Sequence, residues 1–287
     1  FSEVLFKVLA NKGLVPVVPY GDALLFSAGL AGHSFLLNEL DGKDPLSSAL
    51  KFLVGSDEFL SSSSSRCRHE GSCCVLYGLR GFVKPFLIGY LGRSLFASAT
   101  SVPAIVSNPL SLGPTLRDIF TSRAYVRQGI FLGGAVSTFR LVRCLLRDRG
   151  LEERTCRAIA GAIAGPWFLA SRSTSIALHL FWKVVENYYM VALKRGIAPR
   201  IFLGTELIYT LSTAFILFNA VMEPHNVRPS YLRFLNNITG TGLARVNRHP
   251  IEMLGFHSTS CNPDYFPYDI NLSKVHPKFI EQVVIWS

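Results

Sequence analysis

The sequence predicts an all-α, multi-span membrane protein, and three observations support this fold class. Of its 287 residues 49% are hydrophobic and only 17% are charged, with a mean hydropathy of +0.32; an average soluble domain has about 25% charged residues. Apolar segments recur between basic or Pro/Gly-containing stretches. The net charge of +10 comes from Lys and Arg that mostly flank those segments, as membrane-anchoring cations do. We therefore expect lipid around the helices and no nucleic-acid partner.

Six apolar segments are candidate spans. A helix needs about 20 apolar residues to cross a bilayer core, and several of these segments are shorter, so they must tilt or thin the membrane. The second segment is interrupted by Arg80, Lys84 and Pro85, which leaves five or six spans in total. The segments are residues 23–38, 75–98, 128–146, 158–171, 174–193 and 207–222.

The spans and the stretches between them divide the chain into five parts. The last part contains six prolines and few long apolar runs, so we expect it to be a water-facing cap. The five parts are the end of a first helical repeat (1–60), a Ser/Cys-rich loop (61–74), a connecting span with a Pro-rich loop (75–126), a second helical bundle (127–222) and the C-terminal cap (223–287).

The first and second halves share an internal repeat. FSEVLFKVLANKGLVP and VVENYYMVALKRGIAP align without a gap, which places Gly13 on Gly196 and Pro16 on Pro199. Both copies continue as an apolar helix, a proline and a short basic-aromatic helix. Repeated halves are common in membrane bundles. We expect two related halves, the first truncated, with its opening helices upstream of Phe1.

Small residues form stripes on two segments. AIAGAIAGPWF places Gly161 and Gly165 four residues apart, and Gly129, Gly133 and Gly134 extend the pattern to a second helix. Helices in lipid approach closely where small residues face each other. A phosphate-binding loop is excluded because no Lys-Ser/Thr pair follows and no strand precedes. We predict that these five glycines are helix-packing positions that dock other helices.

Several cations lie near or within the ends of the spans. Arg140, Arg143 and Arg147 share one helical face, and Arg172 and Lys183 lie near the ends of other segments. Charge inside a membrane indicates function by default, while cations at span ends also snorkel to headgroups. Two interpretations remain: a path through the protein, or contact with anionic lipid headgroups such as those of cardiolipin.

One loop concentrates potential metal ligands. Cys67, His69, Cys73 and Cys74 occur within eight residues. Structural zinc sites usually bring paired ligands from two separate turns, so these four are weak metal candidates, and a disulfide, a redox role or plain thiols are the alternatives. We predict no metal and no cofactor.

A hydrolase motif is incomplete. GHSF, from Gly32 to Phe35, lacks the second glycine of a nucleophile elbow because Leu36 stands there. His33 and Ser34 are therefore expected to be helix residues within a span. With no carboxylate pair or Cys–His dyad elsewhere, we predict that the protein is not an enzyme.

Several motifs together resemble the transmembrane protein 135 family. They keep their order along nearly the whole chain and include GFVKPFLIGYLGRS, SRSTSIALHLFWKVVE, RPSYLRFL and NRHPIEMLG. That family is similar to the mitochondrial inner-membrane translocase (Tim) family. The resemblance implies a helical organellar membrane protein of mitochondria, peroxisomes or lipid droplets, with roles in organelle dynamics and lipid handling and no established catalytic residues. The chain departs from the family in lacking the N-terminal portion and in a sparser Cys-rich loop.

Two functions follow as expectations. The first is a non-enzymatic accessory component of a mitochondrial inner-membrane assembly, such as a respiratory complex, that packs through its Gly/Ala faces against other membrane-protein subunits. The alternative is a transporter or lipid-handling protein of mitochondria, peroxisomes or lipid droplets. Membrane lipids are expected partners in both cases.

Overall fold

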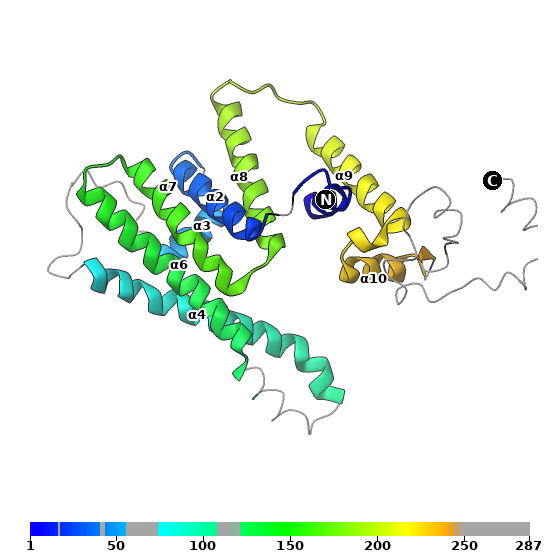
Figure 1. Ribbon diagram of the computed structural model, residues 1–287, viewed down its shortest axis with the longest axis horizontal. Helices are drawn as coiled ribbons and strands as arrows, with labels where there is room; N and C mark the ends of the chain where they lie inside the picture. The colour runs from blue at the N-terminus through cyan, green and yellow to red at the C-terminus, as the bar shows by residue number, and fades with distance from the viewer. Residues whose placement is uncertain are drawn as a thin grey trace, which may run out of the picture. The chain divides into compact units, whose positions relative to one another are not determined.

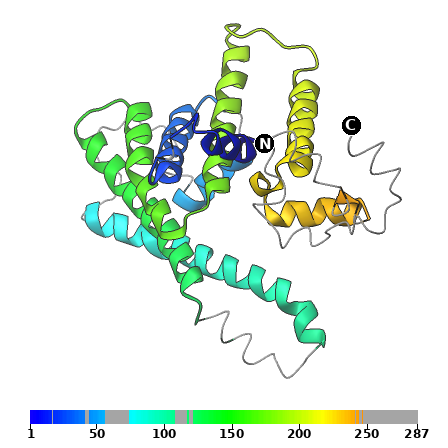
Figure 2. The same ribbon diagram turned by 45° about the vertical axis from the view of Figure 1, so that its right-hand side comes forward.

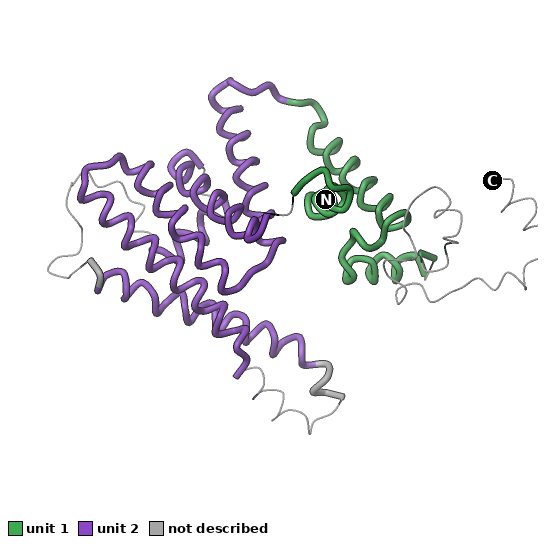
Figure 3. The backbone as a smooth tube through the Cα atoms, in the orientation of Figure 1, with its two compact units in different colours: residues 1–17, 201–287 green, residues 18–200 purple. Residues whose placement is uncertain are grey.

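The computed structural model consists of helices joined by turns. It describes residues 1–16, 18–40, 44–55, 74–107, 117, 121–240, 242–243 and 246, and no β-strand occurs among them. The all-α prediction is therefore confirmed for this part of the chain. The chain forms two compact units, and the first is discontinuous in sequence: unit 1 contains residues 1–17 and 201–287, and unit 2 contains residues 18–200 (Figure 3).

Unit 2 is a bundle in which α4 and α6 run side by side and α2 packs against both α7 and α8 (Figures 1 and 2). The short α3 contacts α4 and α6. The elements are α2 (Gly21–Leu36), α3 (Pro45–Val54), α4 (Cys74–Ser107), α6 (Arg123–Asp148), α7 (Glu153–Ala164), the 3-10 helix η3 (Gly165–Ser171) and α8 (Thr174–Lys194).

The helix boundaries follow local chemistry. Asp44 caps α3 by accepting a hydrogen bond from the Ser47 amide at 2.9 Å, and Pro45 occupies the first turn. The segment expected over 158–171 is not one regular α-helix: α7 begins at Glu153 and gives way to η3 at Gly165. Pro166 has no N–H to continue the α-helical hydrogen bonds, so the backbone tightens there.

Three aromatic rings form the centre of the unit 2 core. Phe168 is fully buried and stacks on Phe26, with the ring centroids 4.4 Å apart. Both rings meet Phe131 edge-on at 5.6 Å. Small side chains fill the space around them, Ala160 and Ala164 among them, and both are completely buried. The end of AIAGAIAGPWF is therefore a core element of unit 2.

Unit 1 has its own small core. It contains α1 (Ser2–Asn11), α9 (Gly204–Met222), the 3-10 helix η4 (Pro224–Asn226) and α10 (Pro229–Ile238). Val4, Ala220 and Leu232 are buried together. Two polar contacts fasten α1 to the segment after α9: Asn11 donates to Asn226 at 2.8 Å, and Arg228 pairs with Glu3 at 2.8 Å. The region predicted as a C-terminal cap thus begins with η4 and α10; residues 247–287 lie outside the described part.

The internal repeat recurs in the backbone. Gly13 and Gly196, which align in the sequence, have φ angles of 69° and 71° after α1 and α8. Tyr20 and Leu203 also align, and they are the two non-glycine residues with positive φ in the described chain, at 61° and 54°. Each directly precedes its helix, α2 or α9. A left-handed L-residue costs about 1–2 kcal/mol, so its recurrence at matched positions indicates a shared local structure.

Two helices of the described chain are long and apolar enough to cross a membrane, α6 and α9. In their most apolar stretches, 44% of α6 but only 11% of α9 is buried. Helix α4 also exposes large apolar side chains: Leu79, Val83 and Leu87 follow one another at four-residue spacings, and Leu95 lies eight residues further on. The exposed apolar side chains of α9 and α4 favour contact with membrane lipid. They support membrane association, which is the more general part of the multi-span prediction.

Candidate functional site

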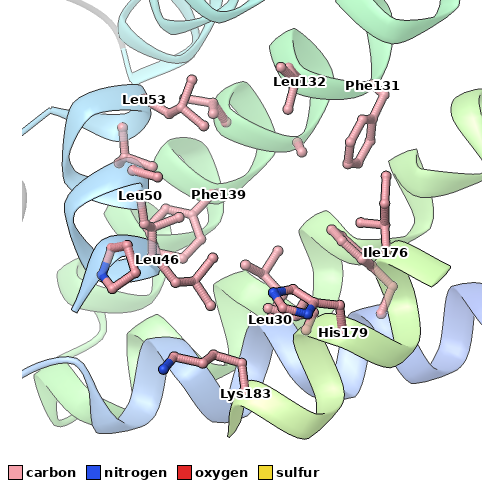
Figure 4. Close-up of a pocket in the computed structure, with 17 residues that line it drawn as sticks. Leu30, Leu46, Leu50, Leu53, Phe131, Leu132, Phe139, Ile176, His179 and Lys183 are labelled. Atoms are coloured by element: carbon pink, nitrogen blue, oxygen red, sulfur yellow. The ribbon is translucent and has the colours of Figure 1, made fainter. Parts of the chain in front are cut away.

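A cavity of about 400 Å³ lies in unit 2 between α2, α3, α6 and α8 (Figure 4). Its walls are apolar apart from two polar side chains of α8, His179 and Lys183. Both lie at the end of the cavity opposite Leu53 and Leu132. Pockets that bind small organic ligands have volumes of about 300–1,000 Å³ and the same combination of apolar walls with few polar groups.

The lining residues repeat with helical spacing. Leu46, Leu50 and Leu53 face the cavity from α3, and Ile176, His179, Leu180 and Lys183 face it from α8. Positions separated by three, four and seven residues lie on one helix face. Phe26 and Phe131, which belong to the aromatic core, form part of the wall. The cavity is therefore bounded by the same packing that holds unit 2 together.

A buried polar network borders the polar end of the cavity. The His33 ring is fully buried, with Nε2 3.4 Å from Ser47 Oγ and Nδ1 3.3 Å from Asn187 Nδ2. Ser47 donates to Asp44 Oδ2 at 2.8 Å, so its oxygen accepts from His33 Nε2–H, and His33 Nδ1 accepts from Asn187. Asp44 also pairs with Lys183, with the amine 3.5 Å from Oδ1. This chain of hydrogen bonds links α8, α2 and the start of α3.

This network contains the residue types of a Ser-His-Asp catalytic triad, but its hydrogen bonds connect them differently. In a Ser-His-Asp triad the serine hydroxyl donates to histidine, and the carboxylate holds the other ring nitrogen. Here the Ser47 hydroxyl donates to Asp44, and Asn187 holds the second nitrogen of His33. Ser47 is only 2% exposed. The geometry supports a structural hydrogen-bond network that fixes one end of the cavity.

The pKa of Asp44 lies below its ordinary value of 3.8. Burial acts to raise this pKa, but the hydrogen bonds from the hydroxyl and amide of Ser47 and the charge of Lys183 outweigh it. A carboxyl group with a depressed pKa stabilises the fold above its unfolded-state pKa, and that contribution is lost as pH falls through the folded-state value. Asp44 is thus ionised at neutral pH.

Replacing Asp44 is expected to destabilise unit 2, and the loss should be larger when both the helix cap and the charge are removed than when the charge alone is removed. Asp44→Ala removes the helix cap and the charge, and should lower the free energy of unfolding by about 1–2 kcal/mol at neutral pH. Asp44→Asn keeps a capping side chain and should cost less. Thermal unfolding in detergent from neutral pH into acid checks this: the gap between wild type and Asp44→Asn should close below pH 3.8. A gap that widens on acidification would contradict an ionised Asp44.

The five predicted packing glycines all lie against other elements of unit 2. A Cβ on Gly129 or Gly133 would meet Phe86 or Phe82 of α4, and one on Gly134 would meet the Trp167 ring. Gly161 and Gly165 lie against α2: a Cβ on Gly161 would be 2.9 Å from the Leu30 carbonyl oxygen, and one on Gly165 would be 2.5 Å from Ser27 Cα. The helices that cover these positions belong to this chain, so no free face is left there for the partner helices that the sequence suggested.

The five predicted headgroup or path cations also have partners within unit 2. Arg140 donates to the Val54 carbonyl oxygen, with Nε at 2.9 Å. Arg143 pairs with Glu153 through Nε and Nη2 at 2.8 and 2.5 Å, and Arg147 lies 3.9 Å from the same carboxylate. The two remaining contacts are Arg172 with Asp22 at 2.8 Å and Lys183 with Glu186 at 3.1 Å. Among the five, Lys183 alone lines the cavity.

Most of the Cys-rich loop lies outside the described residues. Cys67, His69 and Cys73 are not among the described residues, and Cys74 is described only as the first residue of α4. Within the described ranges no three His, Cys, Asp or Glu side chains cluster as a metal site would require.

Sequence reasoning missed the residues that organise the site. The roles of Asp44 and Ser47 could have been predicted from the sequence, because an Asp-Pro pair followed by a serine is typical of the start of a helix. No local pattern predicts the burial of His33 or its contact with Asn187, because these two residues are 154 positions apart in the sequence. The sequence matches no protein-family model, and the chain matches no solved structure.

Proposed function

We propose that this is a non-enzymatic, multi-span organellar membrane protein that holds an apolar lipid chain in the cavity between α2, α3, α6 and α8. The observation that carries the proposal is the cavity itself: about 400 Å³, walled by Leu, Ile, Val, Phe and Ala side chains with a polar group at one end. Each methylene group buried in such a space contributes about 0.8 kcal/mol to binding. This corresponds to the lipid-handling alternative drawn from the sequence.

The charges at the polar end indicate which headgroup the cavity accepts. Lys183 lies 3.5 Å from Asp44 and 3.1 Å from Glu186, so its positive charge already faces two carboxylates. A third carboxylate, from a fatty acid, would meet net negative charge there. A neutral oxygen acceptor can still receive a hydrogen bond from Lys183 or His179. We therefore expect a lipid with a neutral oxygen, such as a long-chain alcohol or ester.

The membrane setting is part of the proposal. Spanning by α6 and α9 is supported by their length and hydropathy, and the exposed leucines of α4 support lipid contact along a third helix. The resemblance to the transmembrane protein 135 family supports an organellar membrane, with the mitochondrial inner membrane favoured and the peroxisomal membrane as the alternative.

A second candidate function is an accessory subunit of a mitochondrial inner-membrane assembly such as a respiratory complex. The exposed surface of α9 favours it, because this 19-residue helix carries six large exposed apolar side chains. They are Leu207, Ile208, Tyr209, Leu211, Leu217 and Phe218. Purification in a mild detergent distinguishes the two: an accessory subunit elutes with a larger assembly, and a lipid carrier elutes alone with bound lipid.

Filling the cavity tests the lipid-binding proposal. Leu50→Trp, which projects an indole from α3 into the cavity, should weaken binding of a radiolabelled long-chain alcohol by about tenfold or more, because the indole occupies the space of several methylene groups. Leu87→Trp adds the same ring to the exposed face of α4 and should bind like wild type. Ala49→Phe, at the exposed rim of the cavity, serves if Leu50→Trp fails to fold. Wild-type affinity in a folded cavity variant would rule out this site.

A further inference from the structure

One arginine of unit 2 is buried, yet two nitrogens of its guanidinium, Nε and Nη2, donate no hydrogen bond. These two nitrogens form the side-on edge of the guanidinium. Arg157, on the first turns of α7, is 1% exposed. Its Nη1 donates to Asn38 Oδ1 at 2.6 Å, whereas Nε and Nη2 have no hydrogen-bond partner in the structure. A buried guanidinium with unmatched donors is costly, since each donor forfeits its bond to water. Such a group is retained where something else supplies the acceptor.

Two other arginines show what this edge binds. Arg172 directs Nε and Nη2 at the two oxygens of Asp22, at 2.9 and 2.8 Å, and Arg143 directs the same two nitrogens at a single oxygen, Oε1 of Glu153. The side-on edge of a guanidinium matches a pair of oxygens on one carboxylate or phosphate. In Arg157 the same edge lacks its pair of oxygens.

The surroundings of Arg157 carry excess positive charge. Arg154 and Arg195 share one carboxylate, Glu39, with contacts of 2.7 and 2.6 Å. On the other side Arg143 and Arg147 share Glu153. Among the described side chains, Arg154, Arg157 and Arg195 outnumber the carboxylates Glu39 and Glu152 that lie beside them, which favours an anionic ligand. A phosphate group brings more negative charge to such a site than a single carboxylate does.

The residues around the hydrogen bond between Arg157 and Asn38 include exposed side chains. Asn38, which accepts from Arg157, is itself exposed, and the side chains of Arg154 and Arg195 are 41% and 56% exposed. Arg154 lies three residues before Arg157 on α7 and therefore on the same side of the helix. A bound ligand would have to displace such exposed side chains to reach Arg157.

We propose that Arg157 is the base of a phosphate-binding site at the end of unit 2 where α2 and α8 end and α7 begins. Nε and Nη2 would donate to two phosphate oxygens, and Arg154 and Arg195 would add charge from the surface. The phosphate group belongs either to an anionic phospholipid or to a soluble compound. The site is separate from the cavity, and it stands whether or not the cavity binds lipid.

Thermal unfolding of the purified full chain in maltoside micelles tests this site. The ligands are inorganic phosphate and short-chain phosphatidic acid, with short-chain phosphatidylcholine for comparison. A ligand that binds the folded state raises the unfolding temperature in a concentration-dependent manner. A rise with inorganic phosphate assigns a soluble source, and a rise with phosphatidic acid alone assigns a lipid headgroup. No rise with either overturns the proposal.

Three variants identify the residue responsible. Arg157→Met removes the guanidinium and should weaken phosphate or phosphatidic acid binding by about tenfold or more, because charged hydrogen bonds are lost. Arg157→Lys keeps the charge but lacks the two-pronged edge, and should also bind weakly. Arg172→Met, where Asp22 already occupies this edge, should bind as wild type does. Unchanged affinity in Arg157→Met would overturn the assignment.

The stability of Arg157→Met without ligand separates a binding role from a structural one. An apolar side chain in place of a buried, incompletely bonded charge is often neutral or stabilising. Arg157→Met should therefore unfold at the wild-type temperature or above it when no phosphate is present. A large loss of stability under that condition would show that Arg157 serves the fold, and would overturn the proposal.

Discussion

Gly165→Ala is expected to lower the free energy of unfolding by about 3 kcal/mol, which is large for the addition of one methyl group. The added Cβ would lie 2.5 Å from the Cα of Ser27 on α2, and no side-chain rotation can move a backbone atom away. Helices α2 and η3 would have to separate. Denaturation in mixed detergent and dodecyl sulfate micelles, followed by circular dichroism, measures the change.

Gly92→Ala is the matched control for this substitution. Gly92 is also helical, and a Cβ there has no neighbour within 4 Å. Alanine exceeds glycine in helix propensity by about 1 kcal/mol, so this variant should be as stable as wild type or more stable. Equal effects at Gly165 and Gly92 would show that α2 and η3 are not in contact at Gly165.

Phe168→Ala is expected to cost about 3–5 kcal/mol, the usual range for removing a buried aromatic ring. Phe168 is completely buried between Phe26 and Phe131, and both of those rings also line the cavity. The loss should therefore appear in unfolding experiments and also as weaker binding of a long-chain alcohol. Leu169→Ala, at the next residue of the same 3-10 helix, removes a 45% exposed side chain and should change the stability little in micelles. Similar losses from both variants would contradict the buried aromatic cluster.

The helices and their close contacts were largely predictable from the sequence. The segment predicted over 174–193 coincides with α8 to within one residue, and the repeat alignment located the turns at Gly13 and Gly196. Gly161 and Gly165 indicated that two backbones meet. A helix face of small residues indicates that another helix can approach closely, but it does not identify that helix. The sequence therefore suggested a partner protein, whereas in the structure these glycines lie against α2.

The cations show a second limit of sequence reasoning. The spacing of Arg140, Arg143 and Arg147 correctly placed them on one helix, but pairing depends on residues distant in sequence. Arg172 and Asp22 are 150 residues apart. Arg157 directly precedes the apolar run that starts at Ala158, and in sequence such an arginine looks the same whether its side chain is buried or exposed.

The cavity could not be predicted because its lining has the spacing of an ordinary core. Leu46, Leu50 and Leu53 show the same helical periodicity as any buried face. A pattern of apolar residues predicts that a face is covered, but the volume left between four helices depends on how their side chains interlock. The cavity therefore emerges only from the assembled unit 2.

The discontinuity of unit 1 sets an order of events during synthesis. Helix α1 emerges before unit 2, but its ion pair from Glu3 to Arg228 spans 225 residues. At translation rates of about 5–20 residues per second, α1 waits roughly 10–45 s for its partner to leave the ribosome. All of unit 2 lies between, at residues 18–200. Helix α1 therefore makes this native contact only after all of unit 2 has been synthesised.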